Sequence, residues 1–334
     1  MKIPVLHLAA GVIAALSMQS AAGAQYPVLK ASRGADSVLL VGSLHVGKTD
    51  GERAAQALLL VRQSSALCFE VDQNDAAGAA EDSKVIFLNR PGSDLRSRIG
   101  PATYEATVAH LRWFLNDGKQ IDALSPFAVS TILTMNLPQL KKDTLAMAPA
   151  TSPDADLARA AARLGKPVLA IEHPGAARAA FAAISDAEWS DYVSGMISIL
   201  DCPSCAHLYS ENMIKANHLQ TDFESLHRQL HAAMASAPRM LAVIERLHFG
   251  QRNRDIAAAI TRPLDQRRCE LVAVGIGHLG GANGLVALLR KAGWQVDQVS
   301  ADGGSPAAAQ VQSAPAPAGL SIPTAARRAA GAQR

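Results

Sequence analysis

Aromatic side chains are scarce in this chain of 334 residues: they make up 4% of the total, although 49% of the residues are hydrophobic. Alanine, leucine and valine must therefore supply most of any core. The hydrophobic fraction excludes a disordered protein. Charged residues are also few, at 18%. No apolar run reaches the ~18 residues that a membrane-spanning helix needs, so we expect no transmembrane segment in the mature chain.

Two common catalytic motifs are missing from the sequence. They are the H-E-x-x-H of zinc peptidases and the G-x-S-x-G nucleophile elbow. Assignment as a standard zinc peptidase or serine hydrolase therefore has no support.

Residues 1–24 have the three parts of an export signal. Lys2 gives a positive start, residues 5–16 are apolar, and Ala22-Gly23-Ala24 is a small-residue cleavage site. A simple amphipathic helix is the alternative, but the order of the parts favours a signal. We therefore expect a periplasmic or secreted protein.

The net charge of +3 comes from the two ends of the chain. Lys2 contributes one positive charge, and residues 301–334, with three arginines and Asp302, contribute two. The body between them is neutral, which is not the electrostatic pattern of a nucleic-acid-binding protein. The tail over 303–334 is rich in alanine and proline and has no apolar periodicity, so we expect it to be disordered.

The chain has only four cysteines, which permit three disulfide pairings in an oxidising compartment. Cys202-Pro203-Ser204-Cys205 has the spacing of a redox centre, but no strand leads into it, so we favour a local structural bridge. Cys68 and Cys269 lie on predicted strands, and plain core residues are one interpretation of them.

The body of the chain alternates apolar runs with helical stretches, as an α/β fold does. Because the runs are apolar on both faces, we expect a central, mixed and largely parallel sheet wrapped by helices. One domain is predicted over 27–300, with helical inserts at about 103–136 and 174–262. The expected strands cover residues 38–41, 66–71, 167–171, 271–274 and 294–299, with helices over 52–62 and 284–291. Helix starts are predicted at a cap, Asp154, and at two capping boxes, Ser185 with Glu188 and Thr221 with Glu224.

One short pattern, an apolar strand followed by G-x-x-H-x-G, occurs twice in the sequence. The first copy ends at His45 and Gly47, and the second at His278 and Gly280. We expect the glycine at each strand exit to allow a sharp turn that presents the histidine at the carboxyl edge of the sheet. Ligands of α/β sheets bind at that edge.

Two further strands are followed by carboxylates, Glu70 and Glu172. Four strand ends could thus deliver His45, Glu70, Glu172 and His278 to one place. Two imidazoles with one or two carboxylates suit Zn, Mn or Co better than Ca or Mg. The alternatives are hydrogen-bonded structural histidines and solvated or salt-bridged glutamates.

Two other patterns in the sequence are weaker evidence for a binding site. Residues 275–280 also spell G-x-G-x-x-G, a dinucleotide fingerprint, but only one strand follows them, whereas a nucleotide-binding domain needs several. The histidines between His207 and His248 lie on helical stretches at mixed spacings, so we favour a solvated face over a second metal site.

The ordered set of motifs resembles the TraB/GumN family, which is related to the Tiki metalloproteases and to the erythromycin-esterase/ChaN-like group. The matching pieces are Gly42-Ser43-Leu44-His45-Val46-Gly47, Phe69-Glu70, Ile171-Glu172, Arg252-Asn253 and Gly275-Ile276-Gly277-His278-Leu279-Gly280. The resemblance implies a mixed-sheet α/β fold and metal-dependent peptide hydrolysis. It also implies that His45 and His278 are metal ligands and that Glu70 is a ligand or general base.

The expected function is therefore that of an exported metallopeptidase that uses Mn, Co or Zn on a peptide or protein substrate. Glu70 or Glu172 would move the proton, and Arg252 would steady the developing negative charge on the carbonyl oxygen. A salt bridge and cap at a helix start is the structural alternative for Arg252 and Asn253. The competing functions are a non-enzymatic binder of metal or haem and an exported interaction domain.

Overall fold

The structure is a computed structural model that describes residues 26–44, 51–71, 76–112, 118–135, 137, 152–173, 175–217, 222–263, 266 and 269–299. The expected signal over 1–24 and the expected tail over 303–334 lie outside the described residues, as does His45. Among the described helices, none has the length and hydropathy needed to cross a membrane.

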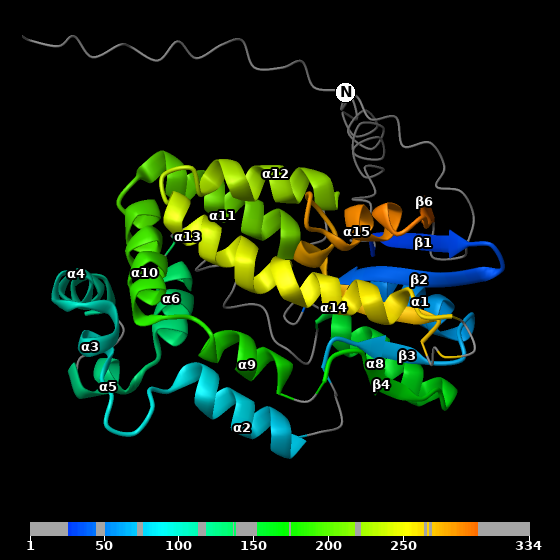
Figure 1. Cartoon of the computed structure of the whole chain (residues 1–334), viewed down its shortest axis with the longest axis horizontal. Coiled ribbons are helices and arrows are strands. Elements are labelled where there is room, and N and C mark those ends of the chain that lie inside the picture. The colour runs from blue at the N-terminus through cyan, green and yellow to red at the C-terminus, as the bar shows by residue number, and fades with distance from the viewer. Residues whose placement is uncertain are drawn as a thin grey trace, which may run out of the picture.

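Six strands of the described chain form one mixed sheet in the order β4-β3-β5-β2-β1-β6 (Figure 1). They are β1 (Val28–Arg33), β2 (Asp36–Ser43), β3 (Leu67–Phe69), β4 (Val168–Ala170), β5 (Leu271–Gly275) and β6 (Gln295–Val299). Strands β4, β3, β5 and β2 run parallel, whereas β1 is antiparallel to both of its neighbours. The expected α/β fold with a mixed, largely parallel sheet is confirmed, although β1 was not expected.

The central strands are buried on both faces, as their uninterrupted apolar sequences predict. Four helices contribute side chains to the same core: α1 (Gly51–Arg62), α8 (Pro153–Leu164), α14 (Gln251–Ile260) and α15 (Leu285–Lys291). α1 packs against α8, and α14 packs against α15. Burial of Leu40, Val272 and Val274 between these helices fixes the position of β2 and β5.

A second, wholly helical core lies beside the sheet, on the left of Figure 1. It is built from α3 (Leu95–Ile99), α4 (Pro101–Leu111), α5 (Gly118–Ala123), α6 (Pro126–Met135), α10 (Asp186–Leu200), α11 (Pro203–Asn217) and α13 (Pro238–Ile244). Its edges are formed by α2 (Ala76–Phe87), α9 (Ala176–Ala182) and α12 (Phe223–Ala233). The six-residue π-helix η2 (Glu245–Gly250) joins α13 to α14 without a break, and so connects the helical core to the sheet.

Helix starts follow the capping signals in the sequence with two differences. Ser185 and Glu188 form the expected capping box of α10. The predicted cap of α8 was Asp154, but Ser152 Oγ accepts the first-turn hydrogen bond from Ala155 N–H, and Asp154 is buried inside the first turn. α12 is capped by Asp222 and not by Thr221, which lies outside the described residues.

All four cysteines form disulfides, Cys68 with Cys269 and Cys202 with Cys205. The predicted local bridge at 202–205 is therefore formed. Cys68 is buried in the core and Cys269 packs against it, but their disulfide shows that the interpretation of the two as plain core residues is wrong. Two disulfides are consistent with an extracytoplasmic location.

Removing the long-range disulfide should destabilise the chain more than removing the local one. The two bonds close loops with sequence separations of 201 and 3 residues. Chain entropy predicts a loss of about 5 kcal/mol for Cys68→Ala/Cys269→Ala and about 2 kcal/mol for Cys202→Ala/Cys205→Ala. Urea unfolding without reductant measures both free energies of unfolding, and equal losses would contradict the prediction.

Candidate functional site

The carboxyl ends of β3, β4 and β5 meet at one edge of the sheet because these strands are parallel neighbours. Glu70 directly follows β3, and Glu172 comes two residues after β4. The backbone N–H of Glu172 donates to the carbonyl oxygen of Glu70 at 3.0 Å, which keeps the two residues side by side. Gly275 ends β5 at the same edge.

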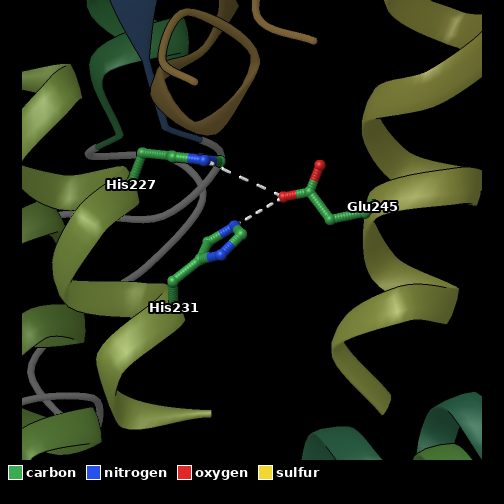
Figure 2. Close-up of side chains that lie close together, drawn as sticks. All are labelled: His227, His231 and Glu245. Atoms are coloured by element: carbon green, nitrogen blue, oxygen red, sulfur yellow. Dashed lines mark hydrogen bonds and ion pairs between the residues drawn. The ribbon is translucent and has the colours of Figure 1, made fainter. Parts of the chain in front are cut away.

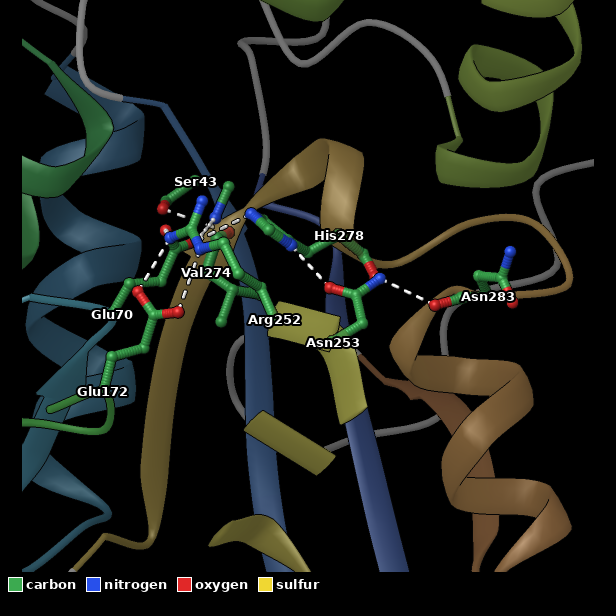
Figure 3. Close-up of polar contacts among 9 residues, drawn as sticks. Ser43, Glu70, Glu172, Arg252, Asn253, Val274, His278 and Asn283 are labelled. Atoms are coloured by element: carbon green, nitrogen blue, oxygen red, sulfur yellow. Dashed lines mark hydrogen bonds and ion pairs between the residues drawn. The ribbon is translucent and has the colours of Figure 1, made fainter. Parts of the chain in front are cut away.

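The Glu70 carboxylate contacts three groups from distant parts of the chain (Figure 3). Its Oε1 accepts a hydrogen bond from the Gly275 N–H at 2.7 Å and lies 3.5 Å from His278 Nε2. Its Oε2 accepts from Arg252 Nη2 at 3.0 Å. The side chain is 7% exposed, so these contacts replace most of the water around its charge.

Arg252, in the first turn of α14, binds Glu172 through two hydrogen bonds. Its Nε donates to Oε1 at 2.9 Å and its Nη2 to Oε2 at 2.7 Å. This two-point geometry matches a guanidinium to a carboxylate. Burial alone would lower the pKa of Arg252, but its hydrogen bond to Glu172 and the charges of Glu70 and Glu172 raise that pKa above its ordinary value. Arg252 is therefore the fixed positive charge of the site.

His278 is oriented by its neighbour in space, Asn253. The ring Nδ1 and Asn253 Oδ1 are 2.5 Å apart, and Asn253 Nδ2 donates to the carbonyl oxygen of Asn283 at 2.7 Å. Because the Asn253 amide nitrogen is used as that donor, its oxygen accepts, and Nδ1 of His278 carries a proton. The other ring nitrogen, Nε2, faces Glu70. Phe249, with its ring centroid 5.6 Å from that of His278, covers the ring edge-on.

The donor chemistry of this pair fits a divalent transition metal. A ligating histidine usually donates its second ring N–H to a carbonyl or carboxylate oxygen, as Asn253 accepts here. His278 Nε2 and Glu70 Oε1, 3.5 Å apart, have the separation of two donors that share an ion at about 2.1 Å each. A proton on Nε2 would satisfy the same contact.

The structure brings together four of the five predicted site residues. It brings Glu70, Glu172, Arg252 and His278 together, whereas His45 lies outside the described residues. β2, which leads to His45, pairs with β5 so that Ser43 lies opposite Gly275. The chain thus leaves β2 at the same sheet edge. The metal-binding and catalytic roles of the predicted site residues stay predictions.

The first glycine of each G-x-x-H copy was expected to allow a sharp turn through a special backbone angle, and this expectation is wrong. In the described residues neither Gly42 nor Gly275 has a positive φ, so neither supplies a special backbone angle. A Cβ on Gly42 would lie 2.6 Å from Pro27 Cγ and 3.0 Å from Leu279 Cδ1, so this glycine is needed for space. Gly275 instead contributes its N–H to Glu70.

A cleft of about 610 Å³ opens next to the Glu172–Arg252 pair, between α9 and the segment from η2 into α14. Its volume lies in the range of small-ligand pockets. Ala176, Ala179 and Ala180 of α9 form one wall, and their small side chains leave the space open. Glu172 and Arg252 belong to its lining and also contact Glu70, so they link the cleft to the sheet edge.

A second cluster consists of His227 and His231 on α12 and Glu245 at the start of η2 (Figure 2). Their ligand atoms all lie within 4.8 Å of one another, so the cluster could hold a metal ion. Burial, followed by the neighbouring charge of His231, lowers the pKa of His227, which favours the neutral, ligating form.

Sequence reasoning missed this cluster. The expected solvated face is wrong for His227, whose side chain is only 17% exposed. The available signal was the spacing of four residues between His227 and His231, which places both on one face of a helix. Glu245, 14 residues beyond His231, has no such signal.

Comparison with known proteins gives one result. A model of the family described as the TraB/PrgY/gumN family matches residues 27–298. The match runs from the residue before β1 into β6 and includes both candidate sites. Searches of curated proteins and of solved structures found no match to this chain.

Replacing Arg252 with methionine should destabilise the fold strongly, because Glu70 and Glu172 would remain buried without their cation. Loss of one partner from a buried ion pair costs about 3–5 kcal/mol. Adding Glu172→Gln to Arg252→Met should recover part of this loss, since one buried charge is removed. Arg239→Met, which removes an arginine that is 79% exposed from its pair with Asp191, is the control. Its unfolding free energy should stay within about 0.5 kcal/mol of the wild type.

Proposed function

Because the chain belongs to the TraB/PrgY/gumN family, we propose that it is an exported, metal-dependent hydrolase that cleaves peptide or protein substrates in the periplasm or outside the cell. The observation that carries the proposal is the convergence of Glu70, Glu172, Arg252 and His278 at one sheet edge beside a cleft. No single segment of the sequence supplies this set of groups.

In this proposal His278 and Glu70, together with His45, hold a divalent ion of the Mn, Co or Zn type. When bound, such an ion polarises a substrate carbonyl and lowers the pKa of a water molecule. Asn253 orients the His278 ring through Nδ1, and the Gly275 N–H orients the Glu70 carboxylate. Both contacts fix donor atoms before any ligand arrives, which is what a precise site requires.

Arg252 and Glu172 have the remaining roles. Arg252 is a positioning residue, since its guanidinium is already shared between two carboxylates. Because Glu70 is a metal ligand in this proposal, Glu172, which lines the cleft and is held by Arg252, is the carboxylate assigned to move the proton. In hydrolysis, water forms a bond to the carbonyl carbon and the C–N bond breaks. Glu172 takes the proton from water and delivers it to the leaving nitrogen.

The cleft suits a short stretch of extended peptide. Its alanine wall on α9 offers apolar contact, and Arg254, Asp255 and Arg262 on the opposite side offer polar contact. A wall of small side chains leaves room for substrate side chains of different sizes. We therefore infer that binding depends mainly on the shape of the cleft and on the peptide backbone.

A non-enzymatic metal- or haem-binding protein is the second candidate function. The observation that favours it is the cluster of His227, His231 and Glu245, which could hold a metal without any residue of the Glu70–His278 pair. A binder of this kind would take up metal without hydrolysing any peptide.

Hydrolysis by purified protein, reconstituted with Mn, Co or Zn after chelation, is the direct test. Glu172→Gln should lower kcat on a peptide library by about 10²- to 10⁴-fold with unchanged metal content, because proton transfer is lost. His45→Ala and His278→Ala should each lose one bound ion per chain together with activity.

The control is His207→Ala, which changes an exposed imidazole on α11. It should keep full activity and metal content. The proposal fails if wild-type protein loaded with each metal cleaves no peptide, or if His45→Ala and His278→Ala both retain every ion.

Narrowing the cleft should weaken substrate binding. Ala180→Leu adds bulk to the wall formed by α9 and should raise KM severalfold with little change in kcat, because it removes space and not a chemical group. Ala182→Leu, on the same helix but outside the cleft lining, is the matched control and should leave KM unchanged. Equal KM values for the two variants would place the substrate elsewhere.

A further inference from the structure

The His227–His231–Glu245 cluster goes beyond the proposed hydrolytic site. We propose that these three side chains bind one divalent transition-metal ion and thereby tie α12 to the π-helix η2. The ion class is Zn, Co or Ni, since these accept imidazole nitrogen and carboxylate oxygen together. This inference does not depend on the hydrolase proposal.

In the cluster, two histidines on one helix face one carboxylate on another. His227 and His231 lie one helical turn apart on α12, with ring centroids separated by 4.3 Å. Glu245 Oε1 lies 2.8 Å from His231 Nε2 and 4.0 Å from His227 Nε2. Donors around a tetrahedral ion are about 3.4 Å apart when each bond is about 2.1 Å. Small side-chain rotations suffice to reach that arrangement.

The backbone beside the cluster fits closely against the His227 ring. Gly281 has a φ of +81°, and a Cβ at this position would lie 2.3 Å from His227 Nε2. Any other residue here would therefore displace the ring. Glycine at position 281 lets His227 stay next to Glu245, which Figure 2 shows on the facing helix.

Burial and donor type also match a metal site. The three side chains are between 17% and 38% exposed, so the donors are partly desolvated but an ion can reach them. Two imidazoles and one glutamate are the protein ligands of several open zinc sites, in which water takes the fourth position. Arg228 stands where the H-E-x-x-H motif has its glutamate base, so this cluster lacks the base of that motif.

The ion would hold a segment that also serves the sheet edge. Glu245 begins η2, Phe249 in the same π-helix contacts the His278 ring, and Arg252 follows in the first turn of α14. π-helical turns are rare and occur frequently at functional sites. A metal at Glu245 would therefore reduce the movement of this segment relative to α12.

Calorimetric titration of the chelated full-length protein with Zn²⁺ tests the inference. His231→Ala and Glu245→Gln should each weaken one class of site by more than about 10-fold, since loss of a group that only supports a ligand already costs 10- to 100-fold. Zn²⁺ should raise the Tm of the wild type more than that of His231→Ala. The same titration in a His278→Ala background isolates this cluster from the sheet-edge site.

The matched control is His207→Ala, because His207 and Glu211 form another histidine–glutamate pair one turn apart on α11. Their side chains are 65% and 47% exposed. This variant should bind Zn²⁺ as the wild type does. The inference is overturned if His231→Ala and Glu245→Gln bind with wild-type affinity, or if His207→Ala weakens binding as much as they do.

The two proposals fail in different ways. Loss of the α12 site in His231→Ala with retained peptide hydrolysis would leave the hydrolase proposal intact. Zn²⁺ binding that persists in His278→Ala and disappears in His231→Ala would support the cluster even if no peptide is cleaved.

Discussion

The guanidinium of Arg252 joins the carboxylates of Glu70 and Glu172 at the ends of two neighbouring strands. Two negative charges buried together cost much free energy unless a cation lies between them. The cation comes from α14, so the helix must dock on the sheet edge for the strand ends to be stable. Docking also places Asn253 against His278. One electrostatic requirement thus positions the groups of the candidate site.

The two candidate sites share a mechanical element, because α13, η2 and α14 form one uninterrupted helical path. Glu245 at the start of the π-helix faces α12, and Phe249 in the same π-helix contacts His278. The path therefore runs from the helical core to the sheet, with the Glu245 contact at the start of the π-helix and the Phe249 contact near its end. The rigidity of this helical path and the docking of α14 on the sheet together limit the movement of the side chains at the sheet edge.

Local sequence patterns predicted much of the fold and part of the site. Apolar runs on both faces predicted parallel strands, and Ser185 with Glu188 predicted the start of α10. Strand β1 was missed because it carries Lys30 and Arg33, and because its pairing with β6 links segments at opposite ends of the body. The glycine exits were recognised for the wrong reason, since Gly42 provides space and not a special backbone angle.

The sequence by itself determined which chemical groups stand at the strand ends, because strand periodicity and the residue after each strand are local properties. Only the tertiary structure decided which groups meet. The Cys68–Cys269 bond, the contact of Arg252 with two glutamates and the approach of Glu245 to α12 join segments far apart in the sequence or on separate helices. Such contacts depend on strand order and helix docking, which arise from the packing of the whole core and leave no signal in any short stretch of chain.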